Sequence, residues 1–278
     1  MTLPRGLDLP HLLDAAGSIL DAVSPEFSAG IGAPGVVRKG ANDFATQVDL
    51  DLERRIGSRL RAETGIGVHG EEFGGPPVEE GVVWVLDPID GTFNYSAGLP
   101  LTGILLGLLV DGRSVLGLTW LPISGQRYAG GVGIPLMCNG VRAQVAPPES
   151  LARSAVGFGP FNAAHGGRYP GARRAELIGA LSARVARLRM TGSTGVDMAY
   201  AATGSFGAAI AFGAHPWDNA AGAALVRAAG GAATDLAGND WTVQSPSLVA
   251  GAPGIHAEVM AVVHEVIGEN WTEKDLPT

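Results

Sequence analysis

Apolar positions recur at helical spacing near the start of the chain and predict two long helices there. Over Leu7–Val23 the apolar residues return every three or four positions, which is the spacing of one helix face. A second helix is expected from Thr46 to about Thr64, because Thr46 and Asp49 are spaced as in a capping box with Asp in the usual Glu position. Between the two helices, the glycine-rich stretch 30–35 predicts a loop.

Short apolar runs predict strands in the middle of the chain. Ile66–His69 suits a short strand, and Val82–Leu86 suits a buried one. Two hairpins are expected where apolar runs flank an Asp-Gly or Asn-Gly turn: Leu101–Val110 with Ser114–Leu121, and Leu136–Cys138 with Val141–Val145.

Beyond the proline-containing segment 146–150, expected helices and strands alternate. The helices are Arg173–Arg184, Thr194–Ala202, Asn219–Ala229 and Ile255–Ile267, and the strands are Ala155–Phe158, Gly207–Phe212 and Leu248–Ala250. Mixed order of this kind is typical of a layered α/β or α+β architecture. We expect two closely apposed halves, residues 1–148 and 149–278.

Composition narrows the functional class. The 278 residues carry a net charge of −8 and have no basic cluster, which argues against a nucleic-acid or membrane-surface partner. The longest apolar stretch, 99–110, is too short to span a bilayer. No apolar signal segment begins the chain and Cys138 is the single cysteine, so we expect a cytoplasmic protein in which Cys138 packs as a small hydrophobe.

Carboxylates are rare in two long apolar stretches, which makes those present informative. Between residues 81 and 148 the acids are Asp87, Asp90 and Asp111, and between 177 and 234 they are Asp197 and Asp218. An unpaired charge is costly to bury, so an acid in such surroundings has a reason to be there. Asp111 fits a hairpin turn and Asp197 fits a helix surface, which leaves the other three as candidates for a site.

The strongest local signal is the run from Trp84 to Asn94, WVLDPIDGTFN. An apolar strand ends at Asp87, and Pro88 forces a turn that lets Asp87 and Asp90 converge. Two carboxylates that close repel each other unless a proton or cation lies between them. A hard divalent cation fits, with the Ile89 carbonyl as a further ligand. Two ordinary surface turns are the alternative.

The residues after Asp90 suit phosphate. Gly91 lets the backbone approach a ligand closely, and Thr92 begins a short helix whose amides can bind an anion.

Two other segments add candidate ligands. Glu71, in Gly70-Glu71-Glu72, follows an expected strand and is either a third metal ligand or simply solvated. Asp218 precedes the helix Asn219–Ala229, where it is either a ligand or an N-cap. For His215 the alternatives are a ligand and a hydrogen-bonded structural histidine.

Together these segments resemble the inositol monophosphatase family, whose signatures W-V-L-D-P-I-D-G-T-x-N and P-W-D-x-A-A-G occur here in the same order. The resemblance spans about Ala15 to Val266 and looks most like the actinobacterial branch. It implies a layered α-β-α-β-α sandwich, a homodimer, and a lithium-sensitive, Mg²⁺-dependent phosphatase with two to three ions per site.

The resemblance also implies individual roles. A first Mg²⁺ would be held by Glu71, Asp87 and the Ile89 carbonyl, and a second by Asp87, Asp90 and Asp218, while a third, weaker ion would share Glu71. The catalytic residues would be Glu71, Asp49 and Thr92, the last two positioning the attacking water. Substrate would contact Asp90, Gly91, Thr92, Gly192, Ser193, Thr194 and Asp218. Asn42–Asp49 looks like a family segment, and Lys39 matches a mobile lysine near the metals or is simply solvated.

One departure bears on the substrate. Inositol-specific members have a glutamate where this chain has Ala211, and a site with fewer hydroxyl partners rejects wrong alcohols less strongly. We rank inositol 1-phosphate first and histidinol phosphate second, followed by fructose 1,6-bisphosphate and 3′-phosphoadenosine 5′-phosphate. Outside this chemistry, the alternatives are a non-catalytic metal- or phosphate-binding regulator and a two-metal nuclease, the latter disfavoured by the missing basic stripe.

Overall fold

The chain is described from a computed structural model that places residues 3–4, 6–38, 44–164 and 166–268. The helices are α1 (Leu9–Ala29), α2 (Gln47–Thr64), α3 (Thr92–Ser96), α4 (Gly171–Ser182), α5 (Thr194–Thr203), α6 (Pro216–Ala228) and α7 (Pro253–Ile267), with a 3₁₀ turn at Leu151–Arg153. The strands are β1 (Gly35–Arg38), β2 (Phe44–Thr46), β3 (Gly67–Gly70), β4 (Val82–Asp90), β5 (Gly103–Val110), β6 (Arg113–Leu121), β7 (Gln126–Gly131), β8 (Ile134–Cys138), β9 (Val141–Arg142), β10 (Ala155–Phe158), β11 (Arg187–Arg189), β12 (Ala208–Ala211), β13 (Ala232–Thr234) and β14 (Leu248–Gly251).

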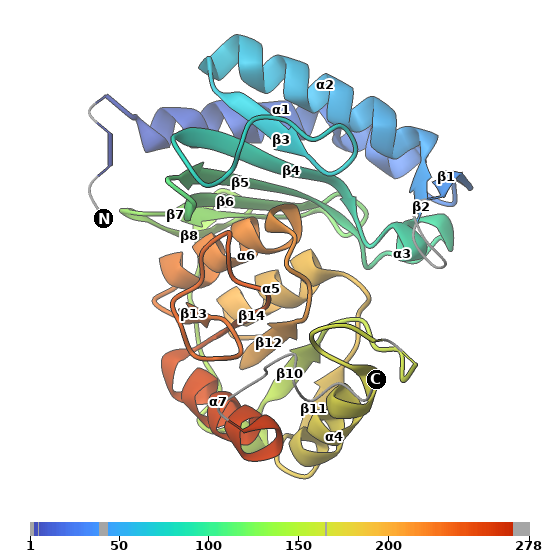
Figure 1. Cartoon of the computed structure of the whole chain (residues 1–278). Coiled ribbons are helices and arrows are strands. Elements are labelled where there is room, and N and C mark those ends of the chain that lie inside the picture. Colours follow the sequence, from blue (N-terminus) through green and yellow to red (C-terminus); the bar gives the residue numbers. More distant parts are fainter. Residues whose placement is uncertain (1–2, 5, 39–43, 165, 269–278) are drawn as a thin grey trace.

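These elements form five stacked layers, which confirms the α-β-α-β-α sandwich (Figure 1). Helices α1 and α2 cover one face of a seven-stranded sheet of order β3-β4-β5-β6-β7-β8-β9, in which only β3 and β4 run parallel. Helices α5 and α6 separate that sheet from a five-stranded sheet of order β11-β10-β12-β14-β13. Helices α4 and α7 cover the outer face of the second sheet.

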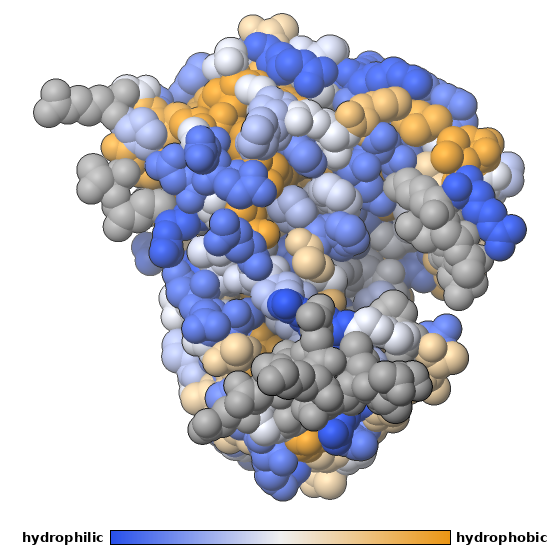
Figure 2. Space-filling view, viewed as in Figure 1, coloured by the Kyte–Doolittle hydropathy of each residue, from blue (hydrophilic) through white to orange (hydrophobic). Residues whose placement is uncertain are grey.

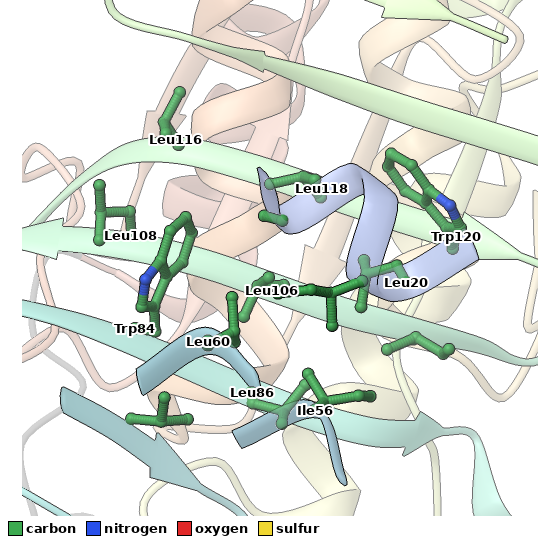
Figure 3. Packing of buried hydrophobic residues seen from close by; sticks show 14 of the residues in the cluster. Leu20, Ile56, Leu60, Trp84, Leu86, Leu106, Leu108, Leu116, Leu118 and Trp120 are labelled. Atoms are coloured by element: carbon green, nitrogen blue, oxygen red, sulfur yellow. The ribbon is translucent and has the colours of Figure 1, made fainter. Parts of the chain in front are cut away.

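Alternating side chains of β4 explain why this strand lies between two helical layers. Trp84 and Leu86 pack with α1 and α2, as Figure 3 shows for Leu20, Ile56 and Leu60 around them. Val83 and Val85 point to the opposite face and pack with α5 and α6. A strand buried on both faces carries an almost continuous apolar run, so its terminal aspartates are delivered into the interior.

Small residues let α6 lie very close to the large sheet. A Cβ placed on Gly107 would lie 2.8 Å from the Cβ of Ala220, and one on Gly117 would lie 3.0 Å from the Cβ of Ala224. Such contacts are shorter than real packing allows. Glycine on the sheet and alanine on the helix therefore set the height at which α6 lies above β5 and β6.

Most expected elements are present, with shifted ends. The capping box of Thr46 and Asp49 is formed at the start of α2, and both predicted hairpin turns exist, with positive φ at Asp111 and Asn139. The strand expected over Val141–Val145 is shorter, since β9 ends at Arg142. The expected loop 30–35 is a turn that leads directly into β1, and strands β1, β2, β7 and β13 were not predicted.

The surface agrees with the charge pattern. Polar and charged side chains cover the outer face of α2 at the top of the molecule (Figure 2). Among the described residues, no helix combines the length and apolar character needed to cross a bilayer.

Candidate active site

Four of the predicted carboxylates reach a common cavity between the two halves of the chain. Glu71 follows β3, Asp87 and Asp90 lie on β4, and Asp218 lies on α6. They line a cavity of about 250 Å³, together with Phe44, Ile89, Gly91, Thr92, Phe93, Pro160, Gly192 and Thr194. Residues from three separate elements thus meet where the sequence places the metal ligands.

Between Asp87 and Asp90, where a turn was expected, β4 continues as an irregular strand. The expectation that the strand ends at Asp87 is wrong, because β4 pairs with β5 up to Asp87 and again at Asp90, with a shifted register between them. The Ile89 amide donates to Asp87 Oδ1 at 2.9 Å, and the Thr92 hydroxyl donates to the Ile89 carbonyl at 3.0 Å. On a regular strand, Asp87 and Asp90 would point to opposite faces of the sheet, because side chains alternate and the two residues are three positions apart. The irregularity brings both carboxylates to the same cavity.

Asp90 is held by the start of α5, from the other half of the chain. The Ser193 hydroxyl and the Gly195 amide donate to Oδ2, the latter at 2.8 Å, and the Thr194 amide donates to Oδ1 at 3.1 Å. Burial outweighs these donors and raises the pKa of Asp90 to about 6. Ser193, predicted to contact substrate, is instead buried against Asp90, whereas Gly192 and Thr194 line the cavity.

Asp87 is a buried carboxylate surrounded by other carboxylates. It is 2% exposed, and burial, followed by the negative charges of Glu71, Asp90 and Asp218, raises its pKa well above the usual value. A cation among these oxygens would reverse the repulsion. The donors are carboxylates and one carbonyl, the set that Mg²⁺ and similar hard ions prefer. Among the described residues, no three His, Cys, Asp or Glu side chains lie close enough together to hold a metal ion as they stand.

Asp49 lies beside this cavity and does not line it. It is 1% exposed, and its Oδ2 accepts from the Thr46 amide at 2.7 Å and from the Thr46 hydroxyl. Burial raises its pKa to about 6 despite those two donors. Its charge acts on Asp87, so it is a neighbour of the carboxylate cluster, and its role in positioning water stays a prediction.

Sequence reasoning missed Glu53 on α2. This carboxylate is 4% exposed and accepts from the Glu72 amide at 2.8 Å and the Phe73 amide at 2.9 Å. It thereby fixes the turn that carries Glu71. The signal was its position: Asp49 and Glu53 are four residues apart on the same helix stripe as Ile56 and Leu60, which is otherwise apolar.

Asp218 is the third residue of α6, since the helix begins at Pro216, so the alternative of an N-cap is wrong. The preceding Trp217 stacks on His215 at a centroid distance of 4.7 Å and on His69 of β3 at 6.0 Å. His215 is therefore an exposed stacking partner, and among the described residues its ring makes no hydrogen bond of the kind expected for a structural histidine. The stack joins the two halves next to Glu71 and Asp218.

A larger cavity of about 680 Å³ adjoins the first and shares Thr194 and Asp218 with it. Ala211, the position of the missing glutamate, lies in its wall. Arg174 also lines it: this buried guanidinium lies 4.5 Å over the ring of Phe212 and donates to the carbonyls of Pro160 and Tyr169.

The two remaining acids of the charge-poor stretches differ from each other. Asp111 occupies its hairpin turn as predicted and accepts from the Gly81 amide at 2.9 Å. The prediction that Asp197 lies on a helix surface is wrong, because its side chain is buried, with the residue 3% exposed. Lys39 and the beginning of the Asn42–Asp49 segment lie outside the described residues.

Comparisons of the sequence and of the structure with known proteins all lead to the same family. The model of the inositol monophosphatase family matches residues 11–268. The chain is 53% identical over 266 residues to inositol-1-monophosphatase ImpA of Mycolicibacterium smegmatis, covering 95% of this chain and 96% of that protein. It is 52% identical over 255 residues to a probable inositol 1-monophosphatase ImpA of Mycobacterium tuberculosis, covering 92% and 94%. The solved structure of a Thermotoga maritima IMPase superposes with a TM-score of 0.83 at 28% identity, covering 92% of this chain and 98% of that one.

Proposed function

The chain belongs to the inositol monophosphatase family, and we propose that it is a Mg²⁺-dependent phosphoric monoester hydrolase acting on inositol 1-phosphate. The observation that carries this is the meeting of Glu71, Asp87, Asp90 and Asp218 around one cavity. The names of the mycobacterial relatives support the substrate.

The family resemblance suggests which residues hold each ion. Glu71, Asp87 and the Ile89 carbonyl would hold a first Mg²⁺, and Asp87, Asp90 and Asp218 a second. A third, weaker ion would share Glu71. When bound, Mg²⁺ supplies electrophilic stabilisation of the phosphoryl group and activation of water.

The protein groups orient the reactants. The Thr92 hydroxyl, already on the Ile89 carbonyl, and Asp49 would position the attacking water. Asp49 has a pKa of about 6, so it is a candidate to accept a proton near neutral pH, while Glu71 lies at the cavity. The amides of Gly91 and Thr92 would face the phosphate.

The larger cavity would hold the alcohol that leaves. Its volume of about 680 Å³ is within the range of sites for small ligands, and it starts from Thr194 and Asp218. Ala211 offers no carboxylate to ring hydroxyls, so histidinol phosphate or another sugar or nucleotide phosphate remains the second candidate. We propose that the protein is a homodimer, as the family resemblance implies, and that it is cytoplasmic, in keeping with its single cysteine.

The test is a phosphate-release assay over inositol 1-phosphate, histidinol phosphate, fructose 1,6-bisphosphate and 3′-phosphoadenosine 5′-phosphate, with Mg²⁺, with chelator and with added Li⁺. We expect Mg²⁺-dependent turnover that is greatest for inositol 1-phosphate and inhibited by Li⁺. Asp87→Asn and Asp218→Asn should each reduce turnover by about 10²-fold or more, because each removes a ligand charge.

Asp111→Asn is the matched control, since its side chain lies in a surface hairpin turn where Asn also tolerates positive φ. Circular dichroism would verify that all three variants fold. Turnover that is unchanged in the Asp87 or Asp218 variant, or that persists without divalent ions, would contradict the proposed function.

A further inference from the structure

Asp197 is a buried acid for which the mechanism above has no use. It lies in the first turn of α5, is 3% exposed, and makes one side-chain hydrogen bond, at 2.8 Å between its Oδ1 and the Thr191 hydroxyl. Within the described residues, no Arg, Lys or His pairs with it. Burying an ionised carboxylate without a cation costs free energy. Burial therefore favours the neutral form of Asp197.

The Thr191 hydroxyl has one proton, but two acceptor oxygens lie within hydrogen-bond distance of it. Its hydroxyl oxygen lies 2.8 Å from Asp197 Oδ1 and 3.0 Å from the Ser193 carbonyl, and it also accepts from the Ser193 amide at 3.3 Å. A hydroxyl has a single proton to donate. With an ionised Asp197, Thr191 could satisfy only one of the two acceptors.

A neutral Asp197 satisfies every contact. Its carboxyl proton is donated to the Thr191 oxygen, and the Thr191 proton is then donated to the Ser193 carbonyl. Burial, followed by the effect of Asp90, raises the pKa of Asp197 to about 8, in agreement with this assignment.

This small network leads directly to a proposed metal ligand. The segment Thr191–Gly195 supplies the Ser193 hydroxyl and the amides of Thr194 and Gly195, the three donors to the Asp90 carboxylate. Its other end is tied down by Asn94, whose amide donates to the Thr191 carbonyl at 2.8 Å. Thr191 is therefore the point at which both the backbone and the side chain anchor the segment.

We propose that Asp197 is a positioning residue: as a neutral carboxylic acid it donates to Thr191 and so fixes the segment that orients Asp90 for Mg²⁺. Asp197 lines neither of the two cavities of the candidate active site. The inference rests on the proposed function only in taking Asp90 as a metal ligand.

Mg²⁺ binding, measured by calorimetry, tests the coupling without turnover. Asp197→Leu removes the donor at similar volume, and Thr191→Val breaks the same link from its other end. We expect each to weaken Mg²⁺ binding by about tenfold, the scale found when outer-shell partners of metal ligands are removed. The double variant should be no weaker than either single one, because both remove one link. Asp197→Asn, whose amide can donate to Thr191, should stay within about threefold of the wild type.

The control is Asp235→Leu, which removes another buried carboxyl, 7% exposed, that accepts from the Ala237 and Asn239 amides. It should lower the melting temperature and leave Mg²⁺ affinity unchanged. If Asp197→Leu and Thr191→Val behave like this control, Asp197 has a structural role only and the proposal fails.

Infrared spectroscopy tests the protonation state in the wild-type protein. The Mg²⁺-loaded protein near pH 7 should show the carbonyl stretch of a protonated carboxylic acid, and this band should vanish in Asp197→Asn. A missing band would overturn the proposal even if the leucine variant did not fold. A wild type that shows the band but binds no Mg²⁺ would instead overturn the proposed function and, with it, the coupling to Asp90.

Discussion

Gly91 shows how a single missing side chain can shape the site. It has φ +77° directly after Asp90, and a Cβ at this position would lie 3.1 Å from the Leu101 carbonyl and 3.2 Å from both the Gly192 carbonyl and Ser193 Cβ. The left-handed conformation alone disfavours any other residue. The crowding is an additional constraint, and it involves the segment that holds Asp90.

We therefore expect Gly91→Ala to lower the free energy of unfolding by about 1–2 kcal/mol through backbone strain and to reduce turnover by at least about tenfold through displacement of the Asp90 donors. Thermal unfolding and phosphate release measure the two effects. Gly98→Ala is the matched control, because Gly98 has φ +74° and nothing within 4 Å of its would-be Cβ. Equal turnover in the two variants would show that crowding at Gly91 has no functional effect.

Among the elements, α2 contributes more to the site than its place at the top of the molecule suggests. Its first turn carries Asp49, and one turn later Glu53 accepts both amides of the turn after Glu71. A Cβ on Gly70 would collide with the Glu53 carboxylate, so the helix and the turn fit closely. The helix therefore sets the position of Glu71 without contacting the cavity.

Glu53→Gln should loosen this turn, because an amide offers one acceptor oxygen in place of two. We expect Mg²⁺ to bind about tenfold more weakly, measured by calorimetry, with the fold retained. Glu63→Gln, on the exposed end of the same helix in an ion pair with Arg59, should have no effect, since exposed pairs contribute little. An unaltered Mg²⁺ affinity in Glu53→Gln would mean that Glu71 is positioned by other contacts.

Elements with a strong local signal were predictable, and those that depend on tertiary pairing were not. The capping box fixed the start of α2, and Asp-Gly and Asn-Gly fixed two turns, because these signals act over a few residues. Strands β7 and β13 were missed because they consist largely of glycine, alanine and polar residues that only a neighbouring strand stabilises. Strands β1 and β2 were missed because they are only four and three residues long, too short for a periodic pattern.

The same distinction holds for the site. The carboxylates at Glu71, Asp87, Asp90 and Asp218 could be singled out because each lies directly beside an apolar run or in the first turn of an apolar helix. Glu53 and Asp197 were missed as buried groups, because helical periodicity alone does not say how wide the covered face is. For Asp197 the second covering layer comes from a strand of the other sheet: a Cβ on Gly157 of β10 would lie 3.0 Å from its carboxyl carbon.

At the scale of the whole molecule, the buried acids couple stability to pH. Folding raises the pKa of Asp49 and Asp90 from 3.8 to about 6 and that of Asp197 to about 8. A raised pKa means that the folded state binds protons more tightly, so this contribution to stability is complete below about pH 4 and is lost as the pH rises through 6 and then 8.

Without divalent ions, the melting temperature should therefore fall between about pH 5 and pH 8, each group contributing up to about 1.4 kcal/mol per pH unit within its window. At the proposed site Mg²⁺ would bind the ionised carboxylates, so it should raise the melting temperature more at about pH 8 than at pH 5. Thermal unfolding at both pH values, with Mg²⁺ and with chelator, measures this. A metal-free melting temperature that rises over the interval would contradict the raised pKa values.

The segment 143–150 crosses from one sheet to the other without helix or strand, and four of its eight residues are exposed. Its residues Ala143 and Val145 pack against an apolar cluster that contains Val85 and Leu109 from the first half and Ala220 and Leu248 from the second. This segment, here called the tether, is the covalent connection between the halves. The apolar packing within the cluster is what holds them together. Since the proposed ligands come from both halves, we expect the affinity for the ions to depend on the effective concentration of one half at the other. A longer tether would change that concentration little, because closure entropy grows slowly with length. A poorer fit within the cluster would weaken assembly and ion binding together.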